Sequence, residues 1–148
     1  MKTRTIKQGD TFLDYRLFSI EDIGNITEKE GELLIRIREF MDKKKESFPI
    51  VVIDYMYTAP KGRGTGEATS LLSQFCKTHF DKIIVLSAEP SHMEYEDEEG
   101  EKSYQNISKK LNDFYGKRGF MSLNDKISNI SKTSMIYKNY PYDILIGK

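Results

Sequence analysis

Hydrophobic positions in the middle of the chain change their spacing twice, and each change marks a new element. Residues 50–58 are rich in β-branched and aromatic side chains and stop just before Pro60, which is typical of a largely buried strand. Hydrophobic residues then recur at helical spacing, which predicts an amphipathic helix over residues 66–80. A second short strand is expected over residues 82–90. A strand, a helix and a strand within this length predict a parallel crossover.

The last third of the chain predicts one more helix and two closing strands. Hydrophobic residues keep helical spacing up to Tyr115, so a helix is expected over residues 104–117. The two strands are expected over residues 120–123 and 134–138, and the tail 142–146 is expected to add to a sheet edge. Six acidic side chains fall within residues 94–101, between the predicted strand 82–90 and this helix. This segment is most simply a solvated loop.

The first 47 residues allow two interpretations. A single helical face would hold Leu33, Leu34, Ile37, Phe40 and Met41. Thr27 and Glu30 form a capping-box pattern ahead of that helix, but Ile35 would lie off its hydrophobic face. A strand fits equally well, because Leu33, Ile35 and Ile37 would lie on one face and Arg36 and Arg38 on the other. We prefer the strand, joined by a turn at residues 43–46 to the strand that begins at residue 50.

Composition then narrows the class of protein. The 148 residues are enough for one core, and no repeat or linker divides them, so residues 1–148 are expected to form a single domain. Twenty-three Lys and Arg balance twenty-three Asp and Glu, which disfavours a nucleic-acid partner or an acidic membrane surface. The longest apolar run, residues 50–53, is too short for a membrane span.

Cysteine and histidine are scarce. The single cysteine, Cys76, excludes an intrachain disulfide framework, and with His79 and His92 it leaves few ligands for a soft metal, so no metal is expected. No apolar stretch follows Met1, so no secretory signal is expected. These features predict a cytoplasmic location.

The loop between the first predicted strand and its helix holds the candidate chemistry. Three glycines, Gly62, Gly64 and Gly66, fall within five residues, and consecutive amides at a helix N-terminus suit a pyrophosphate. The same glycines would equally serve a tight strand-to-helix corner. A Walker loop is excluded because Glu67 follows Gly66, and the dinucleotide fingerprint is excluded because Thr69 stands where its third glycine belongs.

Two motifs of this chain resemble the GNAT superfamily of acetyl-CoA-dependent N-acyltransferases. The stretch Arg63-Gly64-Thr65-Gly66-Glu67-Ala68 is similar to the coenzyme A loop of that family. Residues 114–120, in which Phe-Tyr precedes Gly-Phe by three residues, resemble its second signature. The resemblance covers residues 50–138. It implies an α/β (α+β) fold with a mixed, mostly antiparallel sheet, whose two central parallel strands splay apart and are flanked by helices.

The resemblance also implies roles for individual residues. The backbone of Met56, Tyr57 and Thr58 would pair with pantetheine, and the amides of residues 63–68 would hold the pyrophosphate of acetyl-CoA (coenzyme A), which is expected as co-substrate. Tyr115 matches the tyrosine that protonates the departing thiolate. Without the resemblance, Tyr115 would be a packed aromatic on a helix face.

The position of the general base is less defined. By strict alternation Asp54 shares a strand face with Met56 and Thr58, and an acid within an apolar strand favours a functional role. The structural alternative for Asp54 is a salt bridge with Arg36 or Arg38. Two positions depart from the family pattern: Ser87 stands where many members carry a glutamate, and Ser108 where many carry a cofactor-binding asparagine. Glu89 is therefore the reserve candidate for the base or for binding of the amine.

The sequence hypothesis is an N-acetyltransferase that moves an acetyl group from acetyl-CoA directly to a primary amine in a ternary complex. The acceptor is expected to be an amine on a small molecule or a protein, and edge strands leave room for a homodimer. The alternative hypothesis is a catalytically weak or inactive GNAT-like binding module, in which the acidic residues 94–101 dock a basic partner.

Overall fold

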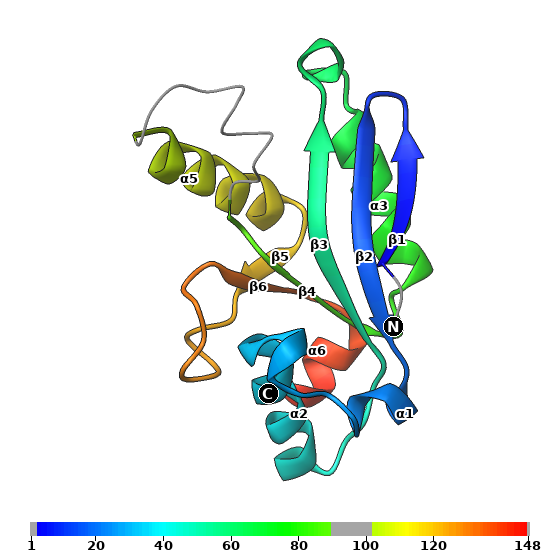
Figure 1. The fold of residues 1–148 in the computed structure, drawn as a ribbon, viewed down its shortest axis with the longest axis vertical. Helices are drawn as coiled ribbons and strands as arrows, with labels where there is room; N and C mark the ends of the chain where they lie inside the picture. The colour runs from blue at the N-terminus through cyan, green and yellow to red at the C-terminus, as the bar shows by residue number, and fades with distance from the viewer. Residues whose placement is uncertain (1–2, 90–101, 148) are drawn as a thin grey trace.

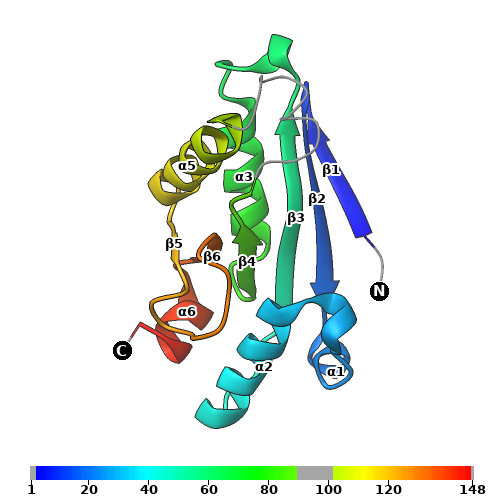
Figure 2. The same cartoon turned by 60° about the vertical axis from the view of Figure 1, so that its left-hand side comes forward.

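The computed structural model describes residues 3–89 and 102–147, which form one six-stranded sheet with helices on both faces (Figures 1 and 2). The strand order is β1-β2-β3-β4-β6-β5. The strands are β1 (Thr3–Gln8), β2 (Thr11–Phe18), β3 (Ile50–Thr58), β4 (Ile83–Ser87), β5 (Phe120–Ser122) and β6 (Ser134–Tyr137). The helices are α1 (Ile20–Ile23), α2 (Glu32–Lys44), α3 (Glu67–Thr78), α5 (Lys102–Lys117) and α6 (Tyr140–Leu145), with short 3-10 turns η1 (Glu28–Glu30) and η2 (Pro60–Gly62).

The central parallel pair is confirmed. β3 runs parallel to β4 from Ile50 opposite Ile83 to Ile53 opposite Leu86, and every other strand pairing is antiparallel. The helix α3 connects the two parallel strands, as the change of hydrophobic spacing predicted. The mixed, mostly antiparallel sheet with helices on its faces is therefore the predicted fold class.

Each face of the sheet buries its own core because side chains of the strands alternate in direction. On one face, Ile50 and Val52 of β3 pack with α1, α2 and α6. On the other face, Val51 and Ile53 pack with α3 and α5. Figure 1 shows α3 behind β1 and β2, and α2 near the end of the sheet where β3 begins. The α3 and α5 face is the one that carries the glycine loop and Tyr115.

The preference for a strand over residues 33–37 is wrong, because this segment lies inside the helix α2. Gly31 has a φ of 112°, a conformation open to few residues other than glycine, and the chain enters the helix there. Leu34, Ile37 and Met41 then face the core at intervals of three and four residues. Ile35 is half-buried against the same core, so it is not misplaced on a helix.

Two other parts of the chain differ from the sequence prediction. The tail predicted to extend a sheet edge instead forms the short helix α6. Asn139 is the N-cap of this helix, because its side chain accepts a hydrogen bond from the Tyr142 amide at 3.2 Å. The hairpin of β1 and β2 has no counterpart among the predicted elements. Across residues 3–89 and 102–147, no helix has the length and apolar content that crossing a bilayer requires.

The buried His79 makes stability depend on pH. It lies just past α3 with its ring 4.6 Å from that of Phe75 and 5.6 Å from that of Tyr15. Burial, reinforced by the nearby Lys82 cation, lowers the pKa of His79 below its usual value of 6.5. Below pH 6.5 the unfolded chain therefore binds a proton that the folded chain does not, and folding is disfavoured.

We expect the Tm, measured by calorimetry, to be flat just above pH 6.5 and to fall by a few degrees as the pH drops from 6.5 towards 5. His79→Phe should remove the dependence in this window, since the lowered pKa values of Asp22, Glu30 and Asp81 matter only below about pH 4.5. An unchanged slope in His79→Phe would contradict this assignment.

Candidate active site

The two parallel strands separate at the middle of β3. Their register ends at Ile53 and Leu86, whereas β3 continues five residues further, to Thr58, paired with β2. At the same point the β2–β3 pairing is irregular: Tyr15 pairs with Ile53 and Asp14 with Tyr55, so that Asp54 is the extra residue of a β-bulge. A bulge bends and twists the strand that carries it, so β3 turns away from β4 here.

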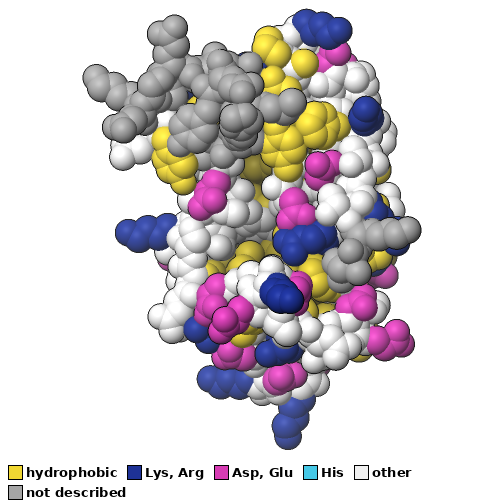
Figure 3. All heavy atoms as spheres, viewed as in Figure 1, with side chains coloured by type: hydrophobic (Ala, Val, Ile, Leu, Met, Phe, Trp, Pro, Cys, Tyr) yellow, Lys and Arg dark blue, Asp and Glu magenta, His cyan; other side chains and the backbone are white. Residues whose placement is uncertain are grey.

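An open cleft occupies the place where the strands diverge, with about 300 Å³ of empty space that includes the open solvent at its mouth. Its walls come from β3, from β4 and the residues after it, and from α5. They are formed by Ile53, Asp54, Tyr55, Met56, Leu86, Ser87, Glu89, Leu111 and Tyr115. On the same face of the molecule hydrophobic side chains gather in the upper half, with acidic and basic side chains below them (Figure 3). The cleft therefore joins an aromatic and apolar wall to two carboxylates.

Asp54 lines the cleft, but its carboxylate is already bound. Both of its oxygens accept hydrogen bonds from the Arg16 guanidinium, at distances of 2.8 to 3.0 Å. The predicted structural partners, Arg36 and Arg38, lie on α2 and are not the residues that bind it. Asp54 also does not share a face with Met56, as strict alternation had predicted, because the bulge adds one residue and reverses the phase.

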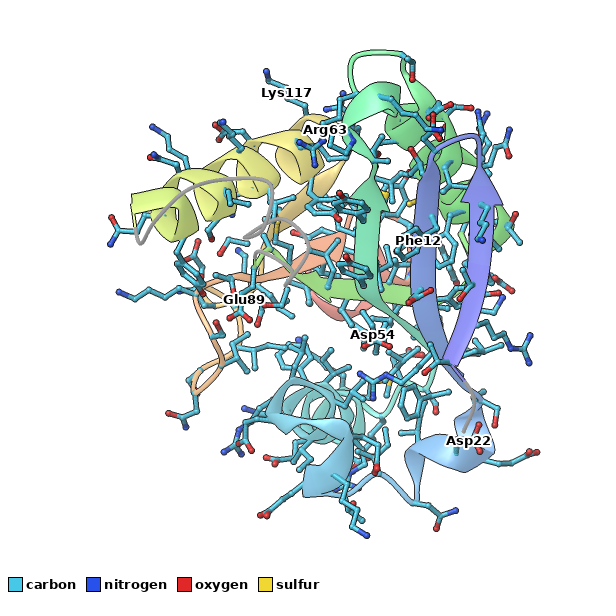
Figure 4. All side chains as sticks on the ribbon, turned by 45° about the horizontal axis from the view of Figure 1, so that its top comes forward. Phe12, Asp22, Asp54, Arg63, Glu89 and Lys117 are labelled. Carbon is cyan, nitrogen blue, oxygen red and sulfur yellow. The ribbon has the colours of Figure 1, made fainter. Side chains whose placement is uncertain are left out.

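Glu89 lies just beyond β4 and belongs to a small hydrogen-bonded network. The Thr133 hydroxyl donates to Glu89 Oε1 at 3.2 Å, and it also lies 2.7 Å from Ser87 Oγ and 2.8 Å from Ser131 Oγ. Figure 4 shows Asp54 at β3, Glu89 beyond the end of β4, and Arg63 past the far end of β3. Sequence analysis missed Thr133, which stands next to a predicted strand and in no motif.

Tyr115 is buried, with 5% of its surface exposed, and it lines the cleft from α5. Its ring packs edge-on against Phe114 and Phe120 at 5.4 and 5.5 Å, so the second motif is also a packing unit. About two turns earlier on α5, the Ser108 hydroxyl donates to the Ala88 carbonyl at 2.8 Å. Ser108, predicted to contact the cofactor, thus joins α5 to the end of β4.

The glycine loop forms an open cradle at the start of α3. Gly64 and Gly66 have φ values of 80° and 86°, and a Cβ built at either position would meet no atom within 4 Å. The Thr65 hydroxyl donates to the Gly62 carbonyl at 2.6 Å and closes the turn from inside. The Arg63 amide donates to the Pro60 carbonyl at 3.3 Å and the Glu67 amide to the Thr65 hydroxyl at 3.4 Å. The space beside Gly64 and Gly66 is open and lies at the positive end of the α3 dipole, which suits a pyrophosphate.

Glu67 and Ala68 open α3, and the Glu67 side chain has a role that the sequence did not predict. Its carboxylate accepts a hydrogen bond from the Asp10 amide at 3.0 Å, in the turn between β1 and β2. Lys61 reaches the Asp10 carboxylate at 3.4 Å from the other side. The Glu67 side chain therefore points towards the hairpin of β1 and β2, and it links the start of α3 to the turn of that hairpin.

Two arginines border this loop. The Arg63 Nε donates to the Thr58 carbonyl at 3.1 Å, and its guanidinium lies 5.7 Å from the centre of the Tyr57 ring. Arg118, which sequence analysis did not single out, stacks on Phe114 at 3.9 Å and donates to the Thr69 hydroxyl at 3.1 Å. Positive charge is thus available on both sides of the cradle, which suits an anionic ligand.

The remaining strand residues of the predicted cofactor site are divided between two surroundings. Met56 lines the cleft and packs against the α3 and α5 core, whereas the Tyr57 ring stacks parallel to Tyr55 at 6.3 Å. The Thr58 hydroxyl lies 2.8 Å from that of Thr11 in the neighbouring strand. The side chains of Met56, Tyr57 and Thr58 thus contact other parts of the protein. The predicted contact of these residues with pantetheine would be made by their backbone.

Other predicted features lie outside the cleft. Cys76 is buried in the core, where burial raises the pKa of its thiol to about 12, so the thiol stays protonated. Within the described residues no group of three or more His, Cys, Asp and Glu side chains is arranged to hold a metal ion. The acidic segment 94–101 lies outside the described residues.

The two motifs implied a pair of parallel strands that splay apart beside a glycine loop and the helix after it. The structure has this architecture, and the strands splay at a β-bulge. The six-stranded mixed sheet is thus the fold class that the resemblance to the GNAT superfamily predicted. No family model matches the sequence, and no curated protein does.

Several solved structures are similar to this chain. One is a histone acetyltransferase HPA2 and related acetyltransferase from Corynebacterium glutamicum, with 20% identity, a TM-score of 0.41, and coverage of 63% of this chain and 43% of that one. AtaT in complex with acetyl-methionyl-tRNA has 10% identity and a TM-score of 0.43 over 86% of this chain and 61% of that one. A mutant of KacT has 12% identity and a TM-score of 0.42 over the same two shares. The chain thus spans 43 to 61% of the length of these proteins.

Proposed function

We propose that this protein transfers the acetyl group of acetyl-CoA to the nitrogen of a primary amine. The observation that carries the proposal is the open glycine cradle at the N-terminus of α3, adjacent to a cleft that contains a buried tyrosine and a carboxylate. Acetyl-CoA fits this arrangement because it is long, anionic at its pyrophosphate and uncharged at its thioester. The glycine cradle suits the pyrophosphate, and the cleft suits the thioester.

The residues would divide the binding of acetyl-CoA between them. Amides within residues 63–68 would hold the pyrophosphate, since this segment includes the N-terminus of α3 and a Cβ built at Gly64 or Gly66 would meet no atom within 4 Å. Arg63 and Arg118 supply positive charge nearby. The backbone of residues 56–58 would align pantetheine, because β3 has separated from β4 by that point.

The chemistry needs a proton acceptor and a proton donor. A primary amine is protonated at neutral pH and cannot attack until it loses one proton, which Glu89 would accept and later release to solvent. The amine lone pair then forms the C–N bond, the thioester C–S bond breaks, and the sulfur carries away the bonding pair. Tyr115 would protonate that thiolate, and the second proton lost by nitrogen restores the tyrosine. We place the base at Glu89 because Arg16 holds both oxygens of Asp54.

Isothermal titration tests the binding half of this proposal. We expect coenzyme A and acetyl-CoA to bind with similar affinity, because both contain the pyrophosphate that the cradle would hold. No heat of binding for either compound at millimolar concentration would overturn the proposed function. ADP serves as a control, since it carries the pyrophosphate without the pantetheine arm and should bind more weakly.

Tyr115→Phe is expected to lower kcat by about two orders of magnitude while the Kd of coenzyme A stays within about twofold. The change removes the hydroxyl and leaves the ring to pack against Phe114 and Phe120. Tyr142→Phe is the matched control, because Tyr142 is equally buried but lies in the core of the opposite face. Equal turnover in Tyr115→Phe and the native protein would remove Tyr115 from the mechanism.

A further inference from the structure

We propose that Thr133 is a positioning residue, whose hydroxyl holds the Glu89 carboxylate where it accepts the proton of the acceptor amine. This inference rests on the proposed function and adds to it a residue from the segment between β5 and β6. That segment reaches the cleft because β6 lies beside β4 in the sheet, with Ser134 opposite Ser87.

The direction of the hydrogen bonds follows from the chemistry of the groups. An ionised carboxylate only accepts, so the single Thr133 hydroxyl proton goes to Glu89 across 3.2 Å. The Thr133 oxygen then accepts from Ser87 at 2.7 Å and from Ser131 at 2.8 Å. Two serine donors therefore orient the threonine hydroxyl, and the threonine in turn orients the glutamate.

The backbone next to Glu89 is held from two sides. The Ala88 amide donates to the Thr133 carbonyl at 2.9 Å, and the Ala88 carbonyl accepts from the Ser108 hydroxyl at 2.8 Å. Ala88 itself is 1% exposed. Because the main chain before Glu89 is fixed in this way, the carboxylate position depends mainly on the side-chain torsions of Glu89, which the Thr133 hydroxyl restrains.

The second carboxylate of the cleft shows why this restraint matters. Asp54 is fixed by the Arg16 guanidinium, whereas among the described residues no Lys or Arg forms an ion pair with Glu89. A neutral hydroxyl donor orients a carboxylate while leaving its charge to accept a proton. Thr133 thus offers Glu89 orientation without the neutralising partner that Asp54 has.

Two acceptors distinguish positioning of a base from a merely structural role. Benzylamine is protonated at neutral pH and needs a base, whereas phenylhydrazine is unprotonated and does not. With benzylamine we expect Thr133→Val to lower kcat by about ten- to a hundredfold. With phenylhydrazine the loss should stay within about twofold, and the Kd of coenzyme A should not change. Thr133→Ser keeps the hydroxyl and should restore turnover with benzylamine.

The remaining outcomes overturn either the inference about Thr133 alone or the proposed function together with it. Equal losses with both acceptors, or no rescue by Thr133→Ser, would make Thr133 a structural residue and overturn the inference. Native turnover in Thr133→Val would do the same, and Thr133→Ala, which needs less space, repeats the comparison if the valine variant does not fold. Native protein that binds coenzyme A but acetylates neither acceptor would overturn the proposed transfer to amines and the inference with it.

Discussion

Glu89→Gln is expected to lower kcat with an alkylammonium acceptor by about two to four orders of magnitude, the contribution typical of a positioned general base. The amide keeps the size of the side chain and accepts the Thr133 hydrogen bond through its oxygen, but it cannot take up the ammonium proton. Binding of coenzyme A should not change, because Glu89 lies at the cleft and not at the glycine cradle. Steady-state kinetics and titration calorimetry on the same preparation measure both quantities.

Asp54→Asn is the matched control for Glu89→Gln, since it neutralises the other carboxylate of the cleft. It weakens the ion pair between Arg16 and Asp54, whose side chains are 23% and 29% exposed, respectively. The free energy of unfolding should therefore fall by no more than about 1 kcal/mol. We expect kcat to stay within about tenfold of the native value. A larger loss in Asp54→Asn than in Glu89→Gln would assign the base to Asp54.

Gly66→Ala is expected to weaken acetyl-CoA binding by about ten- to a hundredfold, which corresponds to about 1.4 to 2.8 kcal/mol. The φ of 86° is unfavourable for alanine, so the loop would relax away from the cradle conformation. The added methyl group would also project into the open space that the pyrophosphate is proposed to occupy. Titration with acetyl-CoA gives the Kd directly.

Gly31→Ala controls for the cost of strain alone. Gly31 also has a positive φ, 112°, with no atom within 4 Å of a built Cβ, but it precedes α2 and not the glycine loop. Both variants should lower the Tm, and only Gly66→Ala should raise the Kd of acetyl-CoA. Equal Kd values in the two variants would contradict a cofactor role for the loop.

The middle of the chain was predictable because local chemistry determines it. Residues 50–58 form β3 at the predicted bounds, since β-branched residues and the following proline leave little choice. The glycine loop was equally visible, because left-handed φ values at Gly64 and Gly66 require glycine. The two motifs then located Tyr115 in the cleft wall without any knowledge of the tertiary structure.

Asp54 and Glu89 were predicted from the sequence as candidates for the base, but the surroundings of these two carboxylates were not predictable, because they depend on pairing between distant strands. A bulge at Asp54 is a property of the β2–β3 register, and the Thr133 to Glu89 bond depends on β6 lying beside β4. The missed strand β2 did carry a signal, since Leu13, Tyr15 and Leu17 alternate with Asp14 and Arg16. In α2, hydrophobic residues occupy consecutive positions, so the sequence fits both helical spacing and strand alternation. Only the packing against the sheet distinguishes the two.

Transfer of a labelled acetyl group tests the central claim most directly. Native protein is mixed with benzylamine and acetyl-CoA labelled with 13C in the acetyl group, and the products are separated and analysed by mass spectrometry. We predict labelled N-acetylbenzylamine in amounts equal to the coenzyme A released, and far less of both with Glu89→Gln. Release of coenzyme A without labelled amide, or no release at all, would contradict an acetyl transfer to nitrogen by this protein.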